Sequence, residues 1–284
     1  MTRIAIVTDS SADLAPSIVA GERITVVPAT IAPGAGTIQD RAPAPRGGET
    51  RADALASRDI APRPEMVDAF ASAFSGLAND HDAVVAVLLS SRLGGIVDAA
   101  LHARDRLAGG VPIEVVDSRS ASMGLGFQVM RAADLARQGA SAVDIVAELR
   151  AAIDRYHVVF SVESVEHLRE SGQIGRSAAM IAEALQLKPL LRIDEGQIVP
   201  YERARTRARA IVELADFVRE LPAVERCAVL YATNRNDANR LLAAIARDIG
   251  LPPDRLTVNQ IGPAVAAHVG PGALGVAVVE TDVE

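Results

Sequence analysis

Hydrophobic runs in the first half of the chain are short, continuous and followed by small polar residues. They lie at residues 4–7, 24–27, 83–89 and 113–116. Uninterrupted apolar runs of this length are typical of strands that are buried on both faces of a parallel sheet. Between them, apolar residues recur every three or four positions, which predicts helices at 13–20, 66–77, 96–107, 124–137 and 143–156. This alternation predicts βαβ units and a Rossmann-like parallel sheet.

The pattern changes beyond residue 157. Helices are predicted at 165–170, 178–185, 206–221 and 237–249, and strands at 158–162, 187–193, 197–201, 227–231, 257–261 and 273–279. The turn Asp194-Glu195-Gly196 joins two of these strands and predicts a hairpin, so this half is α+β. We therefore expect an α/β protein with two domains, 1–156 and 157–284, although the strand at 273–279 could return to the first sheet.

One stretch of the first half does not follow the alternation. Residues 33–64 contain five prolines and four glycines among many charged residues. Such a composition predicts an irregular excursion rather than regular structure, with one short helix near 51–57.

Serines follow the carboxyl ends of three of the predicted parallel strands. The segments are Thr8-Asp9-Ser10-Ser11, Ser90-Ser91-Arg92 and Asp117-Ser118. Because the carboxyl ends of parallel strands meet at one edge of the sheet, where ligands bind, these loops are candidates for a binding site. The serines could instead only cap the helices that follow, with Ser11 as the cap of the first one.

Composition and charge exclude several classes of function. Hydrophobic residues make up 49% of the chain, yet it has no Trp, five Phe and three Tyr, so few aromatic faces are available to stack on single-stranded nucleic acid. The net charge of −7 gives no general attraction to nucleic acid or anionic membranes. The single cysteine, Cys227, excludes an intrachain disulfide and a cysteine-based zinc site. With no secretory signal and no apolar run long enough to span a bilayer, we expect a cytoplasmic protein without stable membrane insertion.

Seven segments, in order along nearly the whole chain, carry a family resemblance. They are IVTDSSADL (6–14), ITVVP (24–28), SSRLGG (90–95), VDSRSASMGLG (116–126), FSVESVEHLRESGQIGR (160–176), LKPLLRIDEGQIVPYERARTR (187–207) and IGPAVAAHVGPGALGVA (261–277). Together they resemble the DegV family of bacterial proteins, which includes the fatty-acid-binding subunits of fatty acid kinase. The resemblance implies two α/β domains with a lipid slot between them. It also implies a long-chain fatty acid as the only ligand, no cofactor or metal, and a separate ATP-dependent kinase that serves phospholipid synthesis.

The resemblance also implies which residues hold the fatty-acid carboxylate. A buried carboxylate needs several hydrogen bonds, preferably one from a charged donor. His268 matches the family's histidine near the carboxylate, and Gly270 after it allows close approach to the backbone. Arg205 matches an arginine that could support this network. Each of these two assignments has an alternative interpretation: His268 could be a buried core residue, and Arg205 could belong to a solvated basic stretch. Hydroxyls that could line the same site belong to Ser10, Ser90, Ser91 and Ser118.

Three positions depart from the family pattern. Gly94 stands where relatives have the serine that holds the carboxylate, and Asp59 aligns where relatives have a second hydroxyl. In the family's basic segment that faces the kinase, only Arg176 remains as a nearby charge. These departures leave open that the protein binds another small amphipathic ligand.

Catalytic motifs are absent from the sequence, which favours a binding protein over an enzyme. There is no phosphate-binding G-x-x-x-x-G-K-[ST], no H-E-x-x-H and no G-x-S-x-G. A Ser/His hydrolase is the remaining alternative, with His268 as general base and Ser10, Ser91 or Ser118 as nucleophile.

Overall fold

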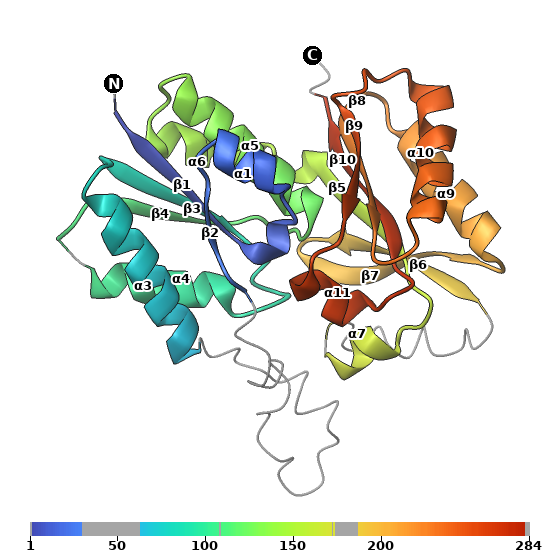
Figure 1. The fold of residues 1–284 in the computed structure, drawn as a ribbon, viewed down its shortest axis with the longest axis horizontal. Coiled ribbons are helices and arrows are strands. Elements are labelled where there is room, and N and C mark those ends of the chain that lie inside the picture. Colours follow the sequence, from blue (N-terminus) through green and yellow to red (C-terminus); the bar gives the residue numbers. More distant parts are fainter. Residues whose placement is uncertain (1, 30–62, 108, 172, 174–186, 282–284) are drawn as a thin grey trace, which may run out of the picture. The chain divides into compact units, whose positions relative to one another are not determined.

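The computed structural model describes residues 2–29, 63–107, 109–171, 173 and 187–281, which form two compact units (Figure 1). The first unit contains the described residues up to Tyr156, and the second contains those from His157 onward. The helices predicted at 51–57 and 178–185 lie outside the described residues, as do Asp59 and Arg176.

The sheet of the first unit is parallel, as predicted. Its strands are β1 (Ile4–Asp9), β2 (Thr25–Val27), β3 (Ala83–Leu88) and β4 (Ile113–Asp117), in the order β2-β1-β3-β4. The register pairs Ile6 with Val85 and Val87 with Val116. All six residues of β3 are buried, which explains why this strand is continuously apolar in the sequence.

Helices cover both faces of this sheet (Figure 1). They are α1 (Pro16–Gly21), α3 (Pro64–Ala78), α4 (Ile96–Arg106), α5 (Met123–Arg137) and α6 (Ala142–Ala151), with the 3₁₀ turns η1 (Ser10–Ala12) and η2 (Ile153–Arg155). Leu125 of α5 and Ile145 of α6 pack on Val85 in the core of one face. On α3, Phe70 and Phe74 are fully buried, with ring centroids 5.7 Å apart.

The segment after β1 differs from the predicted helix at 13–20. Asp9, and not Ser11, caps the first turn, because its side chain accepts a hydrogen bond from the Ser11 N–H. Asp13 then takes a left-handed conformation with φ of 51°, which interrupts the chain before α1. The helix begins at Pro16, since proline is favoured at the first helical position.

The second unit contains a mixed sheet in the order β7-β6-β5-β10-β8-β9. Its strands are β5 (Tyr156–Ser161), β6 (Lys188–Asp194), β7 (Gln197–Ala204), β8 (Val224–Tyr231), β9 (Leu256–Gln260) and β10 (Leu274–Glu280). Strands β6 and β7 form the expected hairpin, whose turn residues Glu195 and Gly196 both have positive φ. Strand β10 pairs with β8 in this sheet, so the strand predicted at 273–279 does not return to the first sheet.

Four helices are described in the second unit: α7 (Glu166–Glu170), α9 (Arg207–Glu220), α10 (Arg235–Ile249) and α11 (Pro263–Val269). Leu214 of α9 and Leu241 of α10 pack on Val229 and Val276 of the sheet. The sequence analysis did not predict α11, because seven residues are too few for a clear apolar period. Pro263 at its start and Gly270 after its end were its only signals.

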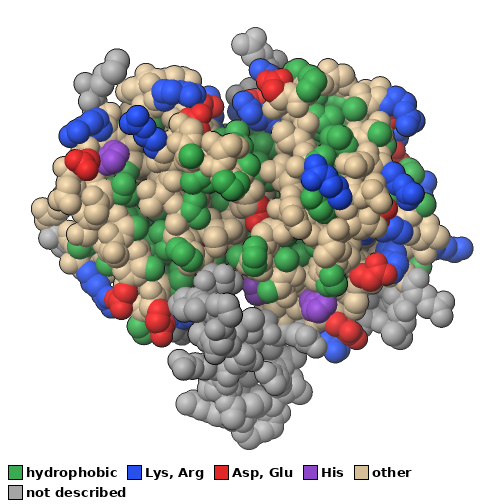
Figure 2. All heavy atoms as spheres, viewed as in Figure 1, with side chains coloured by type: hydrophobic (Ala, Val, Ile, Leu, Met, Phe, Trp, Pro, Cys, Tyr) green, Lys and Arg blue, Asp and Glu red, His purple; other side chains and the backbone are tan. Residues whose placement is uncertain are grey.

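No described helix is long and apolar enough to cross a membrane. On the face drawn in Figure 2, acidic and basic side chains are interspersed over the described residues. This mixture agrees with the net charge in giving that face no broad attraction for an anionic surface.

Cys227 is expected to be unreactive in the folded protein. It lies fully buried on β8, and this burial raises the pKa of its thiol to about 12. Because the thiolate is the nucleophile, almost none of the reactive form exists near neutral pH. Titration with a thiol reagent at pH 8 should label it only after urea is added. Labelling at the same rate with and without urea would contradict the burial.

Candidate functional site

The three serine-bearing loops of the first unit are joined to one another by hydrogen bonds. The Leu89 N–H donates to Oδ2 of Asp9 at 2.9 Å, which ties the end of β1 to the end of β3. The Ser90 N–H donates to the carbonyl of Ser120 at 2.9 Å, and the Ser122 N–H donates to the carbonyl of Ser11 at 2.8 Å. The loops therefore form one connected edge, in the place where the parallel topology predicts it.

The buried side chain of Asp9 holds the loops of this edge together by hydrogen bonds. It is fully buried, and burial raises the pKa of its carboxyl group, while hydrogen bonds from Ser11 and Leu89 act in the opposite direction. Its Oδ1 accepts from both the N–H and the hydroxyl of Ser11. A side chain held in this way organises the loops.

The predicted site serines differ in whether their hydroxyl hydrogens already have an acceptor in the protein. The Ser91 hydroxyl donates to Oδ2 of Asp117 at 2.5 Å, and that of Ser118 donates to the carbonyl of Ser120 at 3.2 Å. Ser10 instead accepts from the Ala29 N–H at 2.8 Å, which leaves its hydrogen for another acceptor. Ser10 is thus better prepared than Ser91 or Ser118 to donate to a bound anion.

Ser90 and Gly94 lie in the turn that leads into α4. The Ser90 side chain is fully buried, and its oxygen accepts from the Arg92 N–H at 3.2 Å. The Gly94 N–H donates to the Ser90 carbonyl at 3.2 Å. A Cβ added at Gly94 would lie 3.3 Å from Cδ2 of Leu89, so a small side chain fits once this flexible leucine shifts slightly.

In the second unit, His268 lies in the last turn of α11. Its side chain is partly buried, and burial lowers the pKa of the imidazole. Its Nδ1 atom is buried and has no hydrogen-bond partner among the described residues. Buried polar atoms are nearly always paired in folded proteins, so an unpaired nitrogen here indicates a place for a ligand or an ordered water.

The residues that follow α11 form a segment, Gly270–Gly272, that is held by several contacts. Gly270 has φ of 78°, and a Cβ at this position would lie 2.4 Å from the His167 ring. The carbonyl of Pro271 accepts from the Thr233 hydroxyl at 2.7 Å. The carbonyl of Gly272 accepts from Nη1 of Arg207 at 2.9 Å. The space beside Gly270 is therefore occupied by the His167 ring, and the binding role of Gly270 stays a prediction.

Arg205 does not support His268 through any described contact. It is exposed, and no described hydrogen bond or ion pair joins it to the imidazole. The guanidinium that reaches the Gly270–Gly272 segment belongs to Arg207, two residues later. The alternation of arginines in this stretch was visible in the sequence, but nothing in that pattern indicates which one points inward.

Sequence analysis named the serines at the strand ends and missed the groups that organise them. Asp9 and Asp117 each accept hydrogen bonds from two or more loop groups. An aspartate followed by serine at the end of a strand was the available signal, because this pair favours local side-chain to backbone bonding.

Within the described part of the chain, no group of three or more His, Cys, Asp or Glu side chains could hold a metal ion.

Comparison with known proteins gives one consistent match. A family model described as an uncharacterised protein of the DegV family matches residues 3–281. The chain is 35% identical to a DegV domain-containing protein of Streptomyces coelicolor, which covers 97% of this chain and 98% of that one. It is 30% identical to Protein DegV of Bacillus subtilis over 72% of this chain and 73% of that one.

A solved structure agrees with these sequence matches. It is that of a DegV family protein from Thermus thermophilus described as binding fatty acid. It is 27% identical, covers 99% of this chain and 100% of its own, and has a TM-score of 0.80. This likeness confirms the predicted α/β fold.

Proposed function

Because the chain belongs to the DegV family, we propose that it binds a long-chain fatty acid and that His268 binds the carboxylate. The single observation that carries this assignment is the buried Nδ1 of His268, which has no hydrogen-bond partner among the described residues. The fatty-acid binding described for the relative from Thermus thermophilus supports the choice of ligand.

The chemistry of His268 fits an anionic head group. A buried donor without a partner carries a free-energy cost of about 1–3 kcal/mol, which a carboxylate oxygen would remove. Protonation would turn the contact into a charge-assisted hydrogen bond, which is about twice as strong as a neutral one. The acyl chain supplies the rest of the affinity, at about 0.8 kcal/mol for each methylene that leaves water.

The first unit offers a further donor of the same kind. Ser10 is proposed to donate its hydroxyl hydrogen to the ligand, since its oxygen already accepts from Ala29. Ser90, Ser91 and Ser118 remain proposed lining residues. The hydrogens of Ser91 and Ser118 are already used, so we expect these two to accept or to shape the loop.

The direct test is to identify what the protein carries. We expect native mass spectrometry of protein purified from a bacterial host to show an acid of roughly 14–18 carbons, whose chain burial is worth about 10 kcal/mol. After delipidation, palmitate should bind and the matched alcohol, hexadecanol, should bind far more weakly. Equal affinity for palmitate and hexadecanol would show that the carboxylate is not recognised. A co-purified molecule of another mass would indicate a different amphipathic ligand.

Presentation of the bound acid to a separate kinase is the further part of this proposal. The chain would supply burial and orientation in the cytoplasm, and the partner would supply ATP and phosphoryl transfer. A bacterial fatty acid kinase should then form acyl phosphate only when the loaded chain is added. A chromogenic ester serves as the control for the hydrolase alternative, and a carrier should not turn it over.

Fatty-acid affinity is expected to rise as pH falls from about 8 to about 6. Burial lowers the pKa of His268 in the free protein, whereas a carboxylate beside it favours the charged imidazolium and raises that pKa in the complex. Binding therefore takes up a proton between the two pKa values, and the affinity gains at most about tenfold for each pH unit. Titrations at several pH values should show this slope in the natural protein and none in His268→Gln. The same slope in both proteins would mean that a group other than His268 takes up the proton on binding.

Gly94→Ser is expected to strengthen fatty-acid binding about fivefold. The added hydroxyl supplies one more donor of about 1 kcal/mol at the position where the family resemblance implies a serine. The backbone accepts the new Cβ, because only the flexible end of Leu89 lies close to it. Gly94→Ala is the matched control, since it adds the same Cβ without the hydroxyl. Equal affinities for the two variants would show that the carboxylate lies away from this turn.

A further inference from the structure

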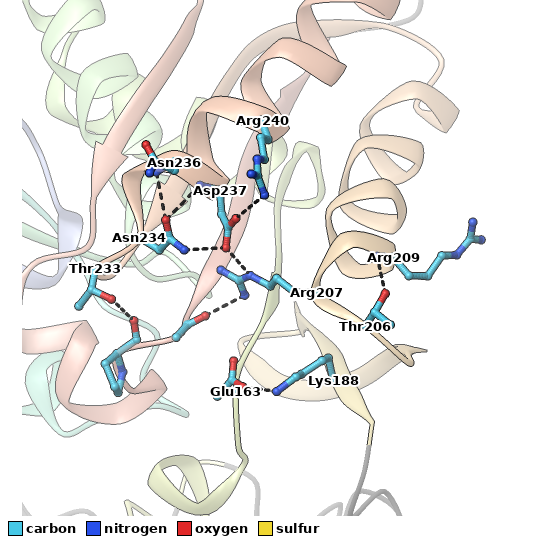
Figure 3. A network of polar contacts seen from close by, with 12 residues as sticks. Glu163, Lys188, Thr206, Arg207, Arg209, Thr233, Asn234, Asn236, Asp237 and Arg240 are labelled. Carbon is cyan, nitrogen blue, oxygen red and sulfur yellow. Dashed lines mark hydrogen bonds and ion pairs between the residues drawn. The ribbon is translucent and has the colours of Figure 1, made fainter.

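Arg207 reaches two acceptors that lie far apart in the sequence (Figure 3). Its Nε donates to Oδ2 of Asp237 at 2.9 Å, and its Nη1 donates to the carbonyl of Gly272 at 2.9 Å. The side chain of Arg207 is 24% exposed and that of Asp237 is 9% exposed, so water competes little for these bonds. The rigid, planar fork of arginine can fix both acceptors at once, whereas the single ammonium of lysine cannot.

Asp237 is itself a fixed acceptor. It lies in the first turn of α10, whose cap residue Asn234 accepts from the N–H of Asp237 and donates from Nδ2 to its Oδ2 at 3.0 Å. Arg240 also approaches this carboxylate, at 3.6 Å, but its side chain is 74% exposed. The start of α10 therefore determines where the Arg207 guanidinium lies.

The bond to Gly272 acts on the part of the chain that carries His268. Within the Gly270–Gly272 segment, the Gly270 N–H donates to the carbonyl of Ala266 at 2.9 Å and so closes the last turn of α11. A helix of seven residues has little stability of its own, because nucleation is costly and few internal bonds follow. The direction of the His268 ring therefore depends on contacts that hold this segment in place.

We propose that Arg207 is a positioning residue, which holds the Gly272 carbonyl and thereby fixes the end of α11 and the orientation of the His268 imidazole. The proposal rests on the fatty-acid function proposed above. It gives to Arg207 the supporting role that the sequence suggested for Arg205. A sheltered ion pair often contributes little net stability, because desolvation offsets the attraction, and such pairs are better known for fixing geometry.

The test compares Arg207→Gln and Arg207→Lys with Arg209→Gln. Arg209 lies on the same helix, where its side chain is 57% exposed and, among the described residues, pairs with Glu213 one turn later, so it is a matched control. We expect both Arg207 variants to bind palmitate about tenfold more weakly at a temperature where they are fully folded. We also expect the ring resonances of His268 to shift in NMR spectra of histidine-labelled protein. Arg209→Gln should change neither measurement.

A double variant separates positioning from general damage. If Arg207 acts through His268, combining Arg207→Gln with His268→Gln should weaken binding no further than His268→Gln alone. The proposal is overturned if the two losses multiply, or if Arg207→Gln lowers the melting temperature and leaves both affinity and ring resonances unchanged. If the natural protein does not bind palmitate, the proposed fatty-acid function is wrong. The His268 resonances of the Arg207 variants then still show whether Arg207 positions the ring.

Discussion

His268→Gln is expected to weaken palmitate binding about 10–100-fold while the protein stays folded. Loss of one charge-assisted hydrogen bond to a buried carboxylate is worth about 1.5–3 kcal/mol, and each 1.4 kcal/mol is tenfold in affinity. The fold should persist, because the Nδ1 atom makes no described hydrogen bond that the variant would lose. Isothermal titration of delipidated protein measures the affinity, and circular dichroism with thermal melting measures the fold.

His102→Gln is the matched control for this experiment. His102 is exposed on α4, and its Nδ1 contacts only the carbonyl of Asp98 in its own helix, at 2.8 Å. Its replacement should change neither affinity nor melting temperature. If His268→Gln instead unfolds the protein and the folded fraction binds normally, then His268 is a core residue and the alternative considered in the sequence analysis is correct.

Gly275→Ala is expected to lower the free energy of unfolding by about 3 kcal/mol. Gly275 lies on β10, inside the second sheet. An added Cβ would lie 2.7 Å from Cβ of Phe160 and 2.7 Å from the carbonyl oxygen of Val159. Because one of these atoms belongs to the backbone, relief requires strands to move apart, and overpacking of this kind typically costs about 1–3 kcal/mol.

Urea unfolding followed by far-ultraviolet circular dichroism measures this loss. Gly76→Ala provides the comparison, since nothing lies within 4 Å of a Cβ at that helical position on α3. That substitution should stabilise the first unit by about 0.5–1 kcal/mol, because alanine favours helix over glycine. Equal midpoints for Gly275→Ala and the natural protein would show that β10 is packed more loosely than the structure indicates.

Much of the fold was predictable from the chain because its signals are local. The buried run Ala83–Leu88 and the polar residues after it specify a parallel strand whose loop lies at the carboxyl edge of the sheet. The hairpin turn at Glu195 and Gly196 was likewise readable, since Gly196 readily adopts the positive φ that the turn requires. The short helix that carries His268 was missed, because seven residues show no clear period.

The candidate site was only partly predictable. His268, Gly270 and the serines at strand ends came from motifs, and the structure shows their surroundings without testing their roles. The choice between Arg205 and Arg207 could not come from sequence, because alternating arginines look alike until Asp237 and Gly272 are placed around one of them.

The sequence by itself determined the class of fold, the family and the residue types available to a carboxylate, since periodicity and motif order survive without coordinates. Only the tertiary structure decided which hydroxyl hydrogens are already used, which nitrogen is buried without a partner, and which guanidinium holds the segment after α11. The Ser91–Asp117 and Arg207–Gly272 bonds join residues 26 and 65 positions apart in the chain, and such a bond exists only when folding brings donor and acceptor to about 3 Å.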